Sequence, residues 1–438
     1  MTDAIKPPRE MGKLGSTLMS VNAMVGAGIF AMPALLYAAI GAFAPWMIMI
    51  VGLLVGAGVI VMARLAAMFR QSGGPQLYAE AAFGKQAGFQ VGWMLLIAII
   101  SSRAANFYVL TSYMAVLLPA LEDPLWQRGA ILFLLVAMTW LTISGMRKAT
   151  AGLVVGSILK LSPILLLCVV ALAKGGIATE VELPTFSEAE AVILLIFYAY
   201  SGTIANSYAA GEVKNPRRTI PKTMLLSLAI IIIFYMVVQW AYIAAAPNPD
   251  EDLTPLTAAA RAVMGETGAL LLTLAAIFSI ATNQLTFYIG GPRIMYGMAR
   301  RGLLPHWLLP LSSKSHTPMA SILFFSALVA LVSLTGGFEF LAIVSSVFSQ
   351  LVGLAAYAAF VAFRTRGHEG IVEGMTLNWW AIIVVASAFN VAALWQAPER
   401  AWLIGAGMMV LGFGLNLITR SQPADAAEVF FDEPPREA

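Results

Sequence analysis

Residues 25–33, VGAGIFAMP, lie in the middle of an apolar run that begins near Leu14 and continues to about Ile40. The run is long enough to cross a bilayer, yet it carries two glycines and a proline at half depth. These residue types weaken a helix, because glycine costs backbone entropy and proline lacks a backbone donor. The stretch therefore predicts a helix that is interrupted inside a membrane.

The composition is that of a polytopic membrane protein. Hydrophobic residues make up 60% of the 438 residues and charged residues only 11%, far from the balance of a soluble chain. The single cysteine, Cys168, excludes a disulfide framework and a thiolate metal cluster. The net charge of +3 is small and is spread over the connections, which argues against a nucleic-acid partner. We therefore expect a lipid bilayer around the protein, no metal and no cofactor.

Twelve apolar segments have the length of a transmembrane helix. They cover residues 14–39, 43–69, 88–118, 128–146, 150–173, 188–210, 221–246, 266–298, 317–335, 339–363, 377–395 and 400–419. Lysine and arginine concentrate in alternate connections, so the positive-inside rule predicts that both termini are cytoplasmic. Two of these cytoplasmic connections, 70–85 and 300–318, are expected to form helices in the membrane interface. The prediction is an all-α, multi-pass protein of the inner or plasma membrane.

A second interruption is predicted at FYAYSGTIAN, residues 197–206, in the sixth segment. It lies five segments after the first, so the two segments cross the membrane in opposite directions. Paired interruptions of this kind indicate the binding site of a secondary transporter. Backbone amides near Gly26 and Gly28 can bind a carboxylate at a helix N-terminus, and carbonyls at 198–201 can accept from an ammonium group. An α-amino acid carries both groups.

The predicted substrate-binding residues surround the two interruptions. They are Val25, Gly26, Ala27, Gly28, Ile29, Tyr198, Ala199, Tyr200, Ser201, Gly202, Thr203 and Ile204. An alternative is that GAG only allows two helices to pack closely, as small residues often do in membranes. The second interruption favours the binding site.

Two cations lie inside predicted membrane segments: Arg103 in the third and Lys160 in the fifth. A cation at the bilayer centre costs about 2.5 to 3.5 kcal/mol on insertion scales, so each is a functional candidate. Snorkelling to the interface, or pairing with a helix C-terminus, is the alternative for Arg103. No aspartate or glutamate falls inside the predicted membrane core. We therefore expect an anionic or strongly polar group of the substrate to meet Arg103, which disfavours polyamines and arginine as substrates.

Four motifs resemble the amino acid-polyamine-organocation (APC) superfamily of transporters. They are GAGIFAMP (26–33), GGPQLYAEAAFG (73–84), AAGEVKNPRRTIPK (209–222) and RIMYGMARRGLLP (293–305), and the resemblance covers about residues 12–365. It implies a five-plus-five inverted repeat with discontinuous helices 1 and 6, followed by two extra helices. The expected division is a cytoplasmic N-terminus (1–13), two repeats (14–173 and 174–363), helices 11 and 12 (364–419) and a cytoplasmic tail (420–438).

The resemblance also implies roles for individual residues. The gating aromatic of the sixth segment corresponds to Tyr198, and a pocket residue of the eighth segment corresponds to Phe287. Ile204 stands where arginine/agmatine exchangers carry an acid, and Arg103 departs from the small or neutral residue that the superfamily has there. A fifth-segment lysine is a feature of exchangers and proton-coupled permeases of this superfamily, where its ammonium fills the space of a sodium ion.

Lys160 is therefore the expected coupling residue. We expect it to bridge the first interruption to the eighth segment near Ser279 and Asn283. Removal from water disfavours the charged form of a lysine, so such a group can release a proton as the site opens and closes.

The predicted function is amino acid transport by alternating access, with exchange or proton coupling and a weak preference for acidic or polar amino acids. A polyamine or basic amino acid antiporter and a transporter-like sensor or channel are the alternatives. An enzyme is disfavoured, because His306, His316 and His368 all fall in connections. The sequence leaves open which amino acid is carried, the direction of transport and the oligomeric state.

Overall fold

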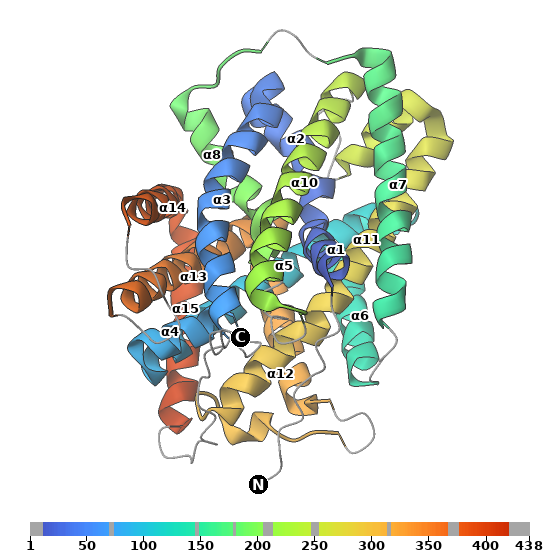
Figure 1. Cartoon of the computed structure of the whole chain (residues 1–438). Helices are drawn as coiled ribbons and strands as arrows, with labels where there is room; N and C mark the ends of the chain where they lie inside the picture. The colour runs from blue at the N-terminus through green and yellow to red at the C-terminus, as the bar shows by residue number, and fades with distance from the viewer. Residues whose placement is uncertain are drawn as a thin grey trace.

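The computed structural model describes residues 12–69, 74–144, 149–177, 181–204, 213–246, 254–312, 317–366 and 376–419. In these ranges the regular structure is helical, apart from residues in isolated bridges, such as Leu311 and Pro318, which pair with each other (Figure 1). The expected all-α fold is confirmed for this part of the chain. The N-terminal residues 1–11, residues 205–210 of the sixth segment, the tail 420–438 and the side chain of Ile204 lie outside the described residues.

The helices follow the predicted apolar segments closely. The first part of the chain forms α1 (Lys13–Met24), α2 (Ala27–Ile40), η1 (Gly41–Phe43), α3 (Ala44–Met68), α4 (Pro75–Phe83), α5 (Lys85–Ala115), η2 (Pro119–Glu122), α6 (Pro124–Ile143) and α7 (Ala149–Gly175). The second part forms α8 (Phe186–Tyr200), η3 (Ser201–Ile204), α10 (Pro216–Ala245), α11 (Pro255–Arg300), η6 (His306–Leu308), α12 (Met319–Ser333), α13 (Phe338–Arg366), α14 (Leu377–Trp395) and α15 (Glu399–Thr419).

The surface of the bundle suits a lipid environment. Among the described residues, eight helical stretches are long and apolar enough to cross a membrane. The helix α6 exposes Trp126, Phe133 and Trp140 to between 65% and 73%, which would be costly in water. In contrast, α5 is buried along nearly its whole length and forms the centre of the bundle. The chain is a multi-pass helical membrane protein.

Helices that are distant in sequence pack in pairs around α5. The long helix α13 and the helix α11 both lie against α5, and α10 lies against α3 and α1. The helix α2 lies against α8. This last pair brings the two predicted interruptions to one place in the fold.

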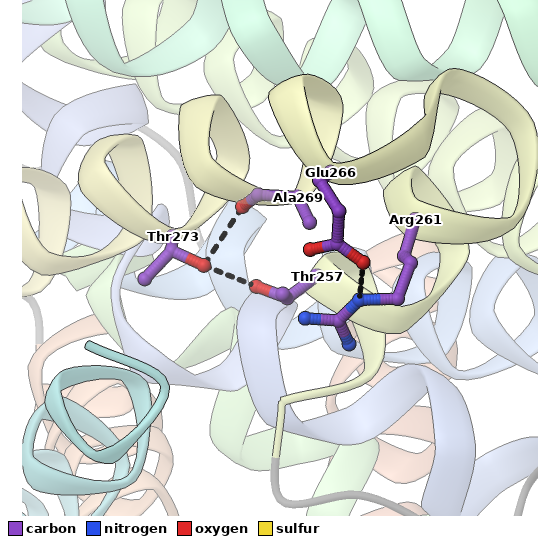
Figure 2. Close-up of polar contacts among 5 residues, drawn as sticks. All are labelled: Thr257, Arg261, Glu266, Ala269 and Thr273. Carbon is purple, nitrogen blue, oxygen red and sulfur yellow. Dashed lines mark hydrogen bonds and ion pairs between the residues drawn. The ribbon is translucent and has the colours of Figure 1, made fainter. Parts of the chain in front are cut away.

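A kink divides α11 at Gly265, which has a positive φ of 69°. Figure 2 shows the polar contacts that connect the two sides of this kink. Arg261 pairs with Glu266 at 2.9 Å, and the hydroxyls of Thr257 and Thr273 lie 2.9 Å apart. Glycine is suited to this position because it has no side chain to strain at positive φ. The expected eighth segment, which starts at residue 266, is therefore the part of α11 after the kink.

The two interfacial helices were expected at 70–85 and 300–318, and only the first one forms. It is α4, and its side chains are buried against α5 and α13 rather than lying free on a surface. The expectation for 300–318 is wrong for its described residues, which hold only the single turn η6. Gly302 at a φ of 70° ends the preceding helix, and Pro305 and Pro310 lack the backbone donors that a longer helix needs. Arg301 of this connection pairs with Glu80 of α4 at 2.7 Å.

Candidate substrate site

The first apolar segment is interrupted at Val25 and Gly26. Val25 has φ −75° and ψ 82°, and Gly26 has φ −121° and ψ −148°, so neither is helical. A new helix, α2, begins at Ala27, and no side chain caps its N-terminus. Because the first amides of a helix have no partner within it, the backbone donors of Ala27, Gly28 and Ile29 point out of the start of α2. These are the amides expected to bind a carboxylate.

The carbonyls at the end of α1 are met by side chains of two other helices. Lys160 of α7 is 1% exposed, and its ammonium donates to the carbonyl oxygens of Asn22 and Val25, both at 3.2 Å. Asn283 of α11 donates to the carbonyl oxygens of Asn22, at 3.3 Å, and Ala23, at 3.2 Å. These bonds satisfy carbonyls that an interruption would otherwise leave unpaired at membrane depth.

Lys160 and Asn283 therefore come together at the end of α1 through a shared acceptor. Both donate to the carbonyl oxygen of Asn22, and no direct bond between them is recorded. The third expected member, Ser279, is buried, and its hydroxyl has no partner among the described residues. It lies one helical turn before Asn283 on α11.

The second interruption touches the first. The helix α8 ends at Tyr200 and continues as the short 3-10 helix η3. A Cβ on Gly202 of η3 would lie 2.5 to 2.6 Å from main-chain atoms of Ala23 and Met24, so the two backbones are in direct contact. A Cβ on Gly28 would likewise lie 3.3 Å from the Cα atom of Ala199. Two glycines thus allow the interrupted helices to approach without intervening side chains.

Tyr235 of α10 was not predicted from the sequence, yet it contacts both interruptions. Its hydroxyl lies 2.8 Å from the carbonyl oxygen of Met24 and 3.3 Å from that of Ala199. The side chain is 2% exposed. Nothing in the apolar sequence around Tyr235 indicates this role, because it depends on the packing of α10 against α1.

Replacing Tyr235 with phenylalanine removes this shared hydroxyl without changing the ring. One net hydrogen bond is worth about 1 kcal/mol, or roughly a fivefold change in an equilibrium constant. We expect uptake by proteoliposomes to fall about fivefold. Tyr108→Phe is the matched control, since it removes a 2.6 Å bond to the carbonyl of Ser333 away from the interruptions. Equal loss of uptake in both variants would contradict a specific role for Tyr235.

Arg103 lies in the centre of the bundle and is 4% exposed. Its guanidinium donates to the side-chain oxygen of Asn283 at 2.7 Å and to the hydroxyl of Ser102 at 2.8 Å. The ring of Phe287 lies 4.0 Å from the guanidinium carbon, which is a cation–π contact. No acidic partner for Arg103 was evident from the sequence, and the side chains that contact it here, those of Asn283, Ser102 and Phe287, are all neutral.

A polar network connects Arg103 to Tyr198. The Tyr198 hydroxyl donates to the side-chain oxygen of Asn106 at 2.6 Å, and Asn106 donates to Asn283 at 3.2 Å. Ser102 donates to the Tyr198 hydroxyl at 3.2 Å. Ser102 and Asn106 were missed by sequence reasoning, although the run SSRAAN (101–106) in a buried helix is a signal that could have identified them.

Two small cavities border the second interruption. The first has a volume of about 30 Å³ and is lined by Leu95, Ala98, Ile99, Ser102, Arg103, Ser201, Gly202, Phe287, Ser345 and Ser349. The second has a volume of about 50 Å³ and is lined by Val55, Gly58, Val59, Met62, Phe197, Tyr200, Ser201, Thr203, Ser349, Val352, Gly353, Tyr357 and Asn390. Ser201 and Ser349 line both cavities.

Some of the predicted substrate-binding residues line a cavity, and the others do not. Arg103, Ser201, Gly202 and Phe287 line the first cavity, and Tyr200, Ser201 and Thr203 line the second. The residues that line neither cavity are Val25, Gly26, Ala27, Gly28, Ile29, Tyr198 and Ala199, all of them buried. In this conformation the two interruptions pack against each other, and the open space lies beside them.

Two apolar helices are interrupted where they touch, and buried cations lie beside the interruptions. These are features of a membrane transporter. A family model described as amino acid permease matches residues 11–417. The chain belongs to this family. The expected membership of the APC superfamily is confirmed, and the chain is a transporter of that superfamily rather than an enzyme.

Relatives cover most of the chain at modest identity. An uncharacterized transporter of Mycobacterium tuberculosis is 28% identical over 445 residues, covering 96% of this chain and 94% of its own. A serine/threonine exchanger of Bacillus subtilis is 26% identical over 87% of this chain and 90% of its own. The small subunit 2 of a large neutral amino acids transporter of Oryctolagus cuniculus is 25% identical over 98% of this chain and 82% of its own.

Proposed function

We propose that this chain is a secondary active amino acid transporter that works by alternating access. Ten of its twelve transmembrane helices form two inverted repeats, 14–173 and 174–363, and the last two helices follow them. Both termini face the cytoplasm, and the protein lies in the inner or plasma membrane. The observation that carries the proposal is the direct backbone contact between the two interruptions, one of which contains the N-terminus of α2 without a side-chain cap.

The zwitterionic part of an amino acid fits these two helix ends. The amides of Ala27, Gly28 and Ile29 bind the α-carboxylate, because the N-terminus of a helix favours negative charge. Carbonyls at the end of α8 accept from the α-ammonium. The first cavity, about 30 Å³, has room for roughly two water molecules, so the helices must separate before a whole amino acid enters.

Lys160 is the coupling residue of this proposal. Its ammonium holds the end of α1 through two carbonyls and has no recorded acidic partner among the described residues. A cation in this place can substitute for a metal ion, and it can also release a proton to the cytoplasm or the outside as α1 moves. Transport by exchange and transport with protons both use this arrangement.

Arg103 favours a substrate with an acidic or polar side chain. It is the charged side chain that lines the first cavity, and a carboxylate can bind a guanidinium with two parallel hydrogen bonds. A polyamine or arginine would bring a further positive charge close to Arg103 and Lys160. The name of the Bacillus subtilis relative, a serine/threonine exchanger, agrees with polar substrates and with exchange.

Competition for uptake tests this preference. Glutamate and serine are expected to compete better than putrescine, and Arg103→Gln is expected to weaken competition by glutamate about tenfold, the value of one charge-assisted hydrogen bond. Competition by serine should change much less, because serine brings no side-chain charge. Putrescine competing better than glutamate would instead support the polyamine alternative.

Counterflow in proteoliposomes tests transport itself. Vesicles loaded with unlabelled serine or glutamate are expected to accumulate the same labelled amino acid transiently, because alternating access exchanges one substrate molecule for another. A channel would equilibrate the label without a transient peak, and a sensor would bind it without transport. A thermal-shift screen against amino acids identifies the ligand for this assay, since binding stabilises the folded state by mass action.

A further inference from the structure

The side chain of Asn283 uses all four of its hydrogen-bonding positions. Its oxygen accepts from Arg103 at 2.7 Å and from Asn106 at 3.2 Å. Its nitrogen donates to the carbonyl oxygens of Asn22 at 3.3 Å and Ala23 at 3.2 Å. This orientation of the amide is the only consistent one, because a guanidinium can only donate and a carbonyl can only accept.

Asn283 therefore connects the first cavity to the end of α1. On one side it binds Arg103, which lines the cavity and whose Nε atom has no partner among the described residues. On the other side it binds the carbonyl oxygens of Asn22 and Ala23 at the end of α1. The side chain is 2% exposed, so water does not compete for these bonds.

An anion that enters the first cavity changes this arrangement. A carboxylate accepts from a guanidinium more strongly than a neutral amide does, and the Nε atom of Arg103 has no partner among the described residues, so an anion draws the guanidinium toward itself and away from Asn283. A neutral substrate has no such effect and leaves the Arg103–Asn283 bond in place. The two kinds of substrate therefore leave Asn283 in different states.

We propose that Asn283 is a positioning residue through which a negatively charged substrate side chain, bound at Arg103, releases the end of α1. The proposal rests on the proposed function and specifies how its binding site controls the helix. With a neutral substrate, Asn283 stays bound to Arg103 and keeps its hydrogen bonds to the carbonyls of Asn22 and Ala23. With an acidic substrate, Asn283 loses its bond to Arg103 and can turn away from Asn22 and Ala23, which leaves Lys160 and Tyr235 as the side chains that bind the carbonyls at the end of α1.

A cysteine placed at Ser20 reports on this release. Ser20 lies on α1 one turn before Met24, and it is 0% exposed, with no hydrogen-bond partner for its hydroxyl among the described residues. A water-soluble maleimide reaches Ser20→Cys only when α1 moves. The native Cys168 is buried, so the unsubstituted protein serves as the labelling blank.

The full-length protein in proteoliposomes is labelled without substrate, with serine and with glutamate. We expect glutamate to raise the labelling rate about tenfold over serine, which corresponds to the loss of one charge-assisted hydrogen bond. Asn283→Asp lacks the two donors to α1, so it should label fast under all three conditions. Arg103→Gln should label slowly under all three, because glutamine still donates to Asn283 but no longer attracts a carboxylate.

The opposite labelling rates expected for Asn283→Asp and Arg103→Gln without substrate distinguish this relay, in which Asn283 transmits the state of Arg103 to α1, from a merely structural role of Asn283. Tyr108→Phe is the matched control, since it removes a hydrogen bond made by the same helix, α5, to the carbonyl of Ser333 away from Asn283, and it should keep the difference between glutamate and serine. Equal labelling with both substrates in the otherwise unchanged protein would overturn the relay, as would a retained difference in Asn283→Asp. Serine counterflow is measured in the same vesicles, so a failure of transport itself is seen separately.

Discussion

Replacing Lys160 with methionine is expected to abolish most transport. Methionine keeps the length of the side chain but has no donor, so the carbonyl of Val25 loses its recorded side-chain partner while that of Asn22 keeps Asn283. A buried carbonyl without a partner costs about 1 to 3 kcal/mol. We expect uptake to fall by at least about tenfold, together with a lower melting temperature and loss of the dependence of uptake on pH.

Lys174→Met is the matched control for this variant. Lys174 lies on the same helix, α7, and also donates to a main-chain carbonyl, that of Val263 at 2.6 Å. It does so at the kink of α11, away from both interruptions. Because Lys174 is exposed, we expect Lys174→Met to lose less stability than Lys160→Met and to keep its uptake. Undiminished, equally pH-dependent uptake by Lys160→Met would remove the coupling role.

Gly202→Ala is expected to reduce transport about as much as Lys160→Met does, but for a steric reason. Its methyl group would lie within 2.6 Å of three main-chain atoms of Ala23 and Met24. Overpacking in a well-packed interior costs about 1 to 3 kcal/mol, and main-chain atoms cannot rotate away as a side chain can. The methyl group would force the two interruptions apart. We therefore expect the rate of counterflow to fall by about tenfold or more. The thermal stabilisation by amino acids should fall with it.

Gly290→Ala serves as the control substitution. Gly290 lies on α11, and a Cβ there would meet no atom within 4 Å. Alanine in a helix interior is more stable than glycine by roughly 0.5 to 1 kcal/mol, so this variant should be as stable as the parent or slightly more so, with normal uptake. Normal counterflow by Gly202→Ala would show that close contact between the interruptions is not needed for transport.

The helices, the position of the first interruption and the two buried cations could be predicted from sequence. Each depends on short-range properties: twenty apolar residues suffice to span a membrane, and glycine weakens a helix wherever it lies. The first interruption is found at Val25 and Gly26, inside the predicted stretch. The prediction for 300–318 fails for a local reason too, because Pro305 and Pro310 lack the backbone donors that a longer helix needs.

The partners of the functional groups were decided by tertiary structure alone. The sequence indicated that Lys160 and Arg103 need partners, but not that Lys160 would meet main-chain carbonyls of α1 or that Arg103 would meet Asn283. Nothing in the sequence around Tyr235 predicted its contacts with Met24 and Ala199. The physical reason is that local sequence sets the cost of burying a charge or breaking a helix, whereas the groups that offset this cost come from helices brought together only by packing.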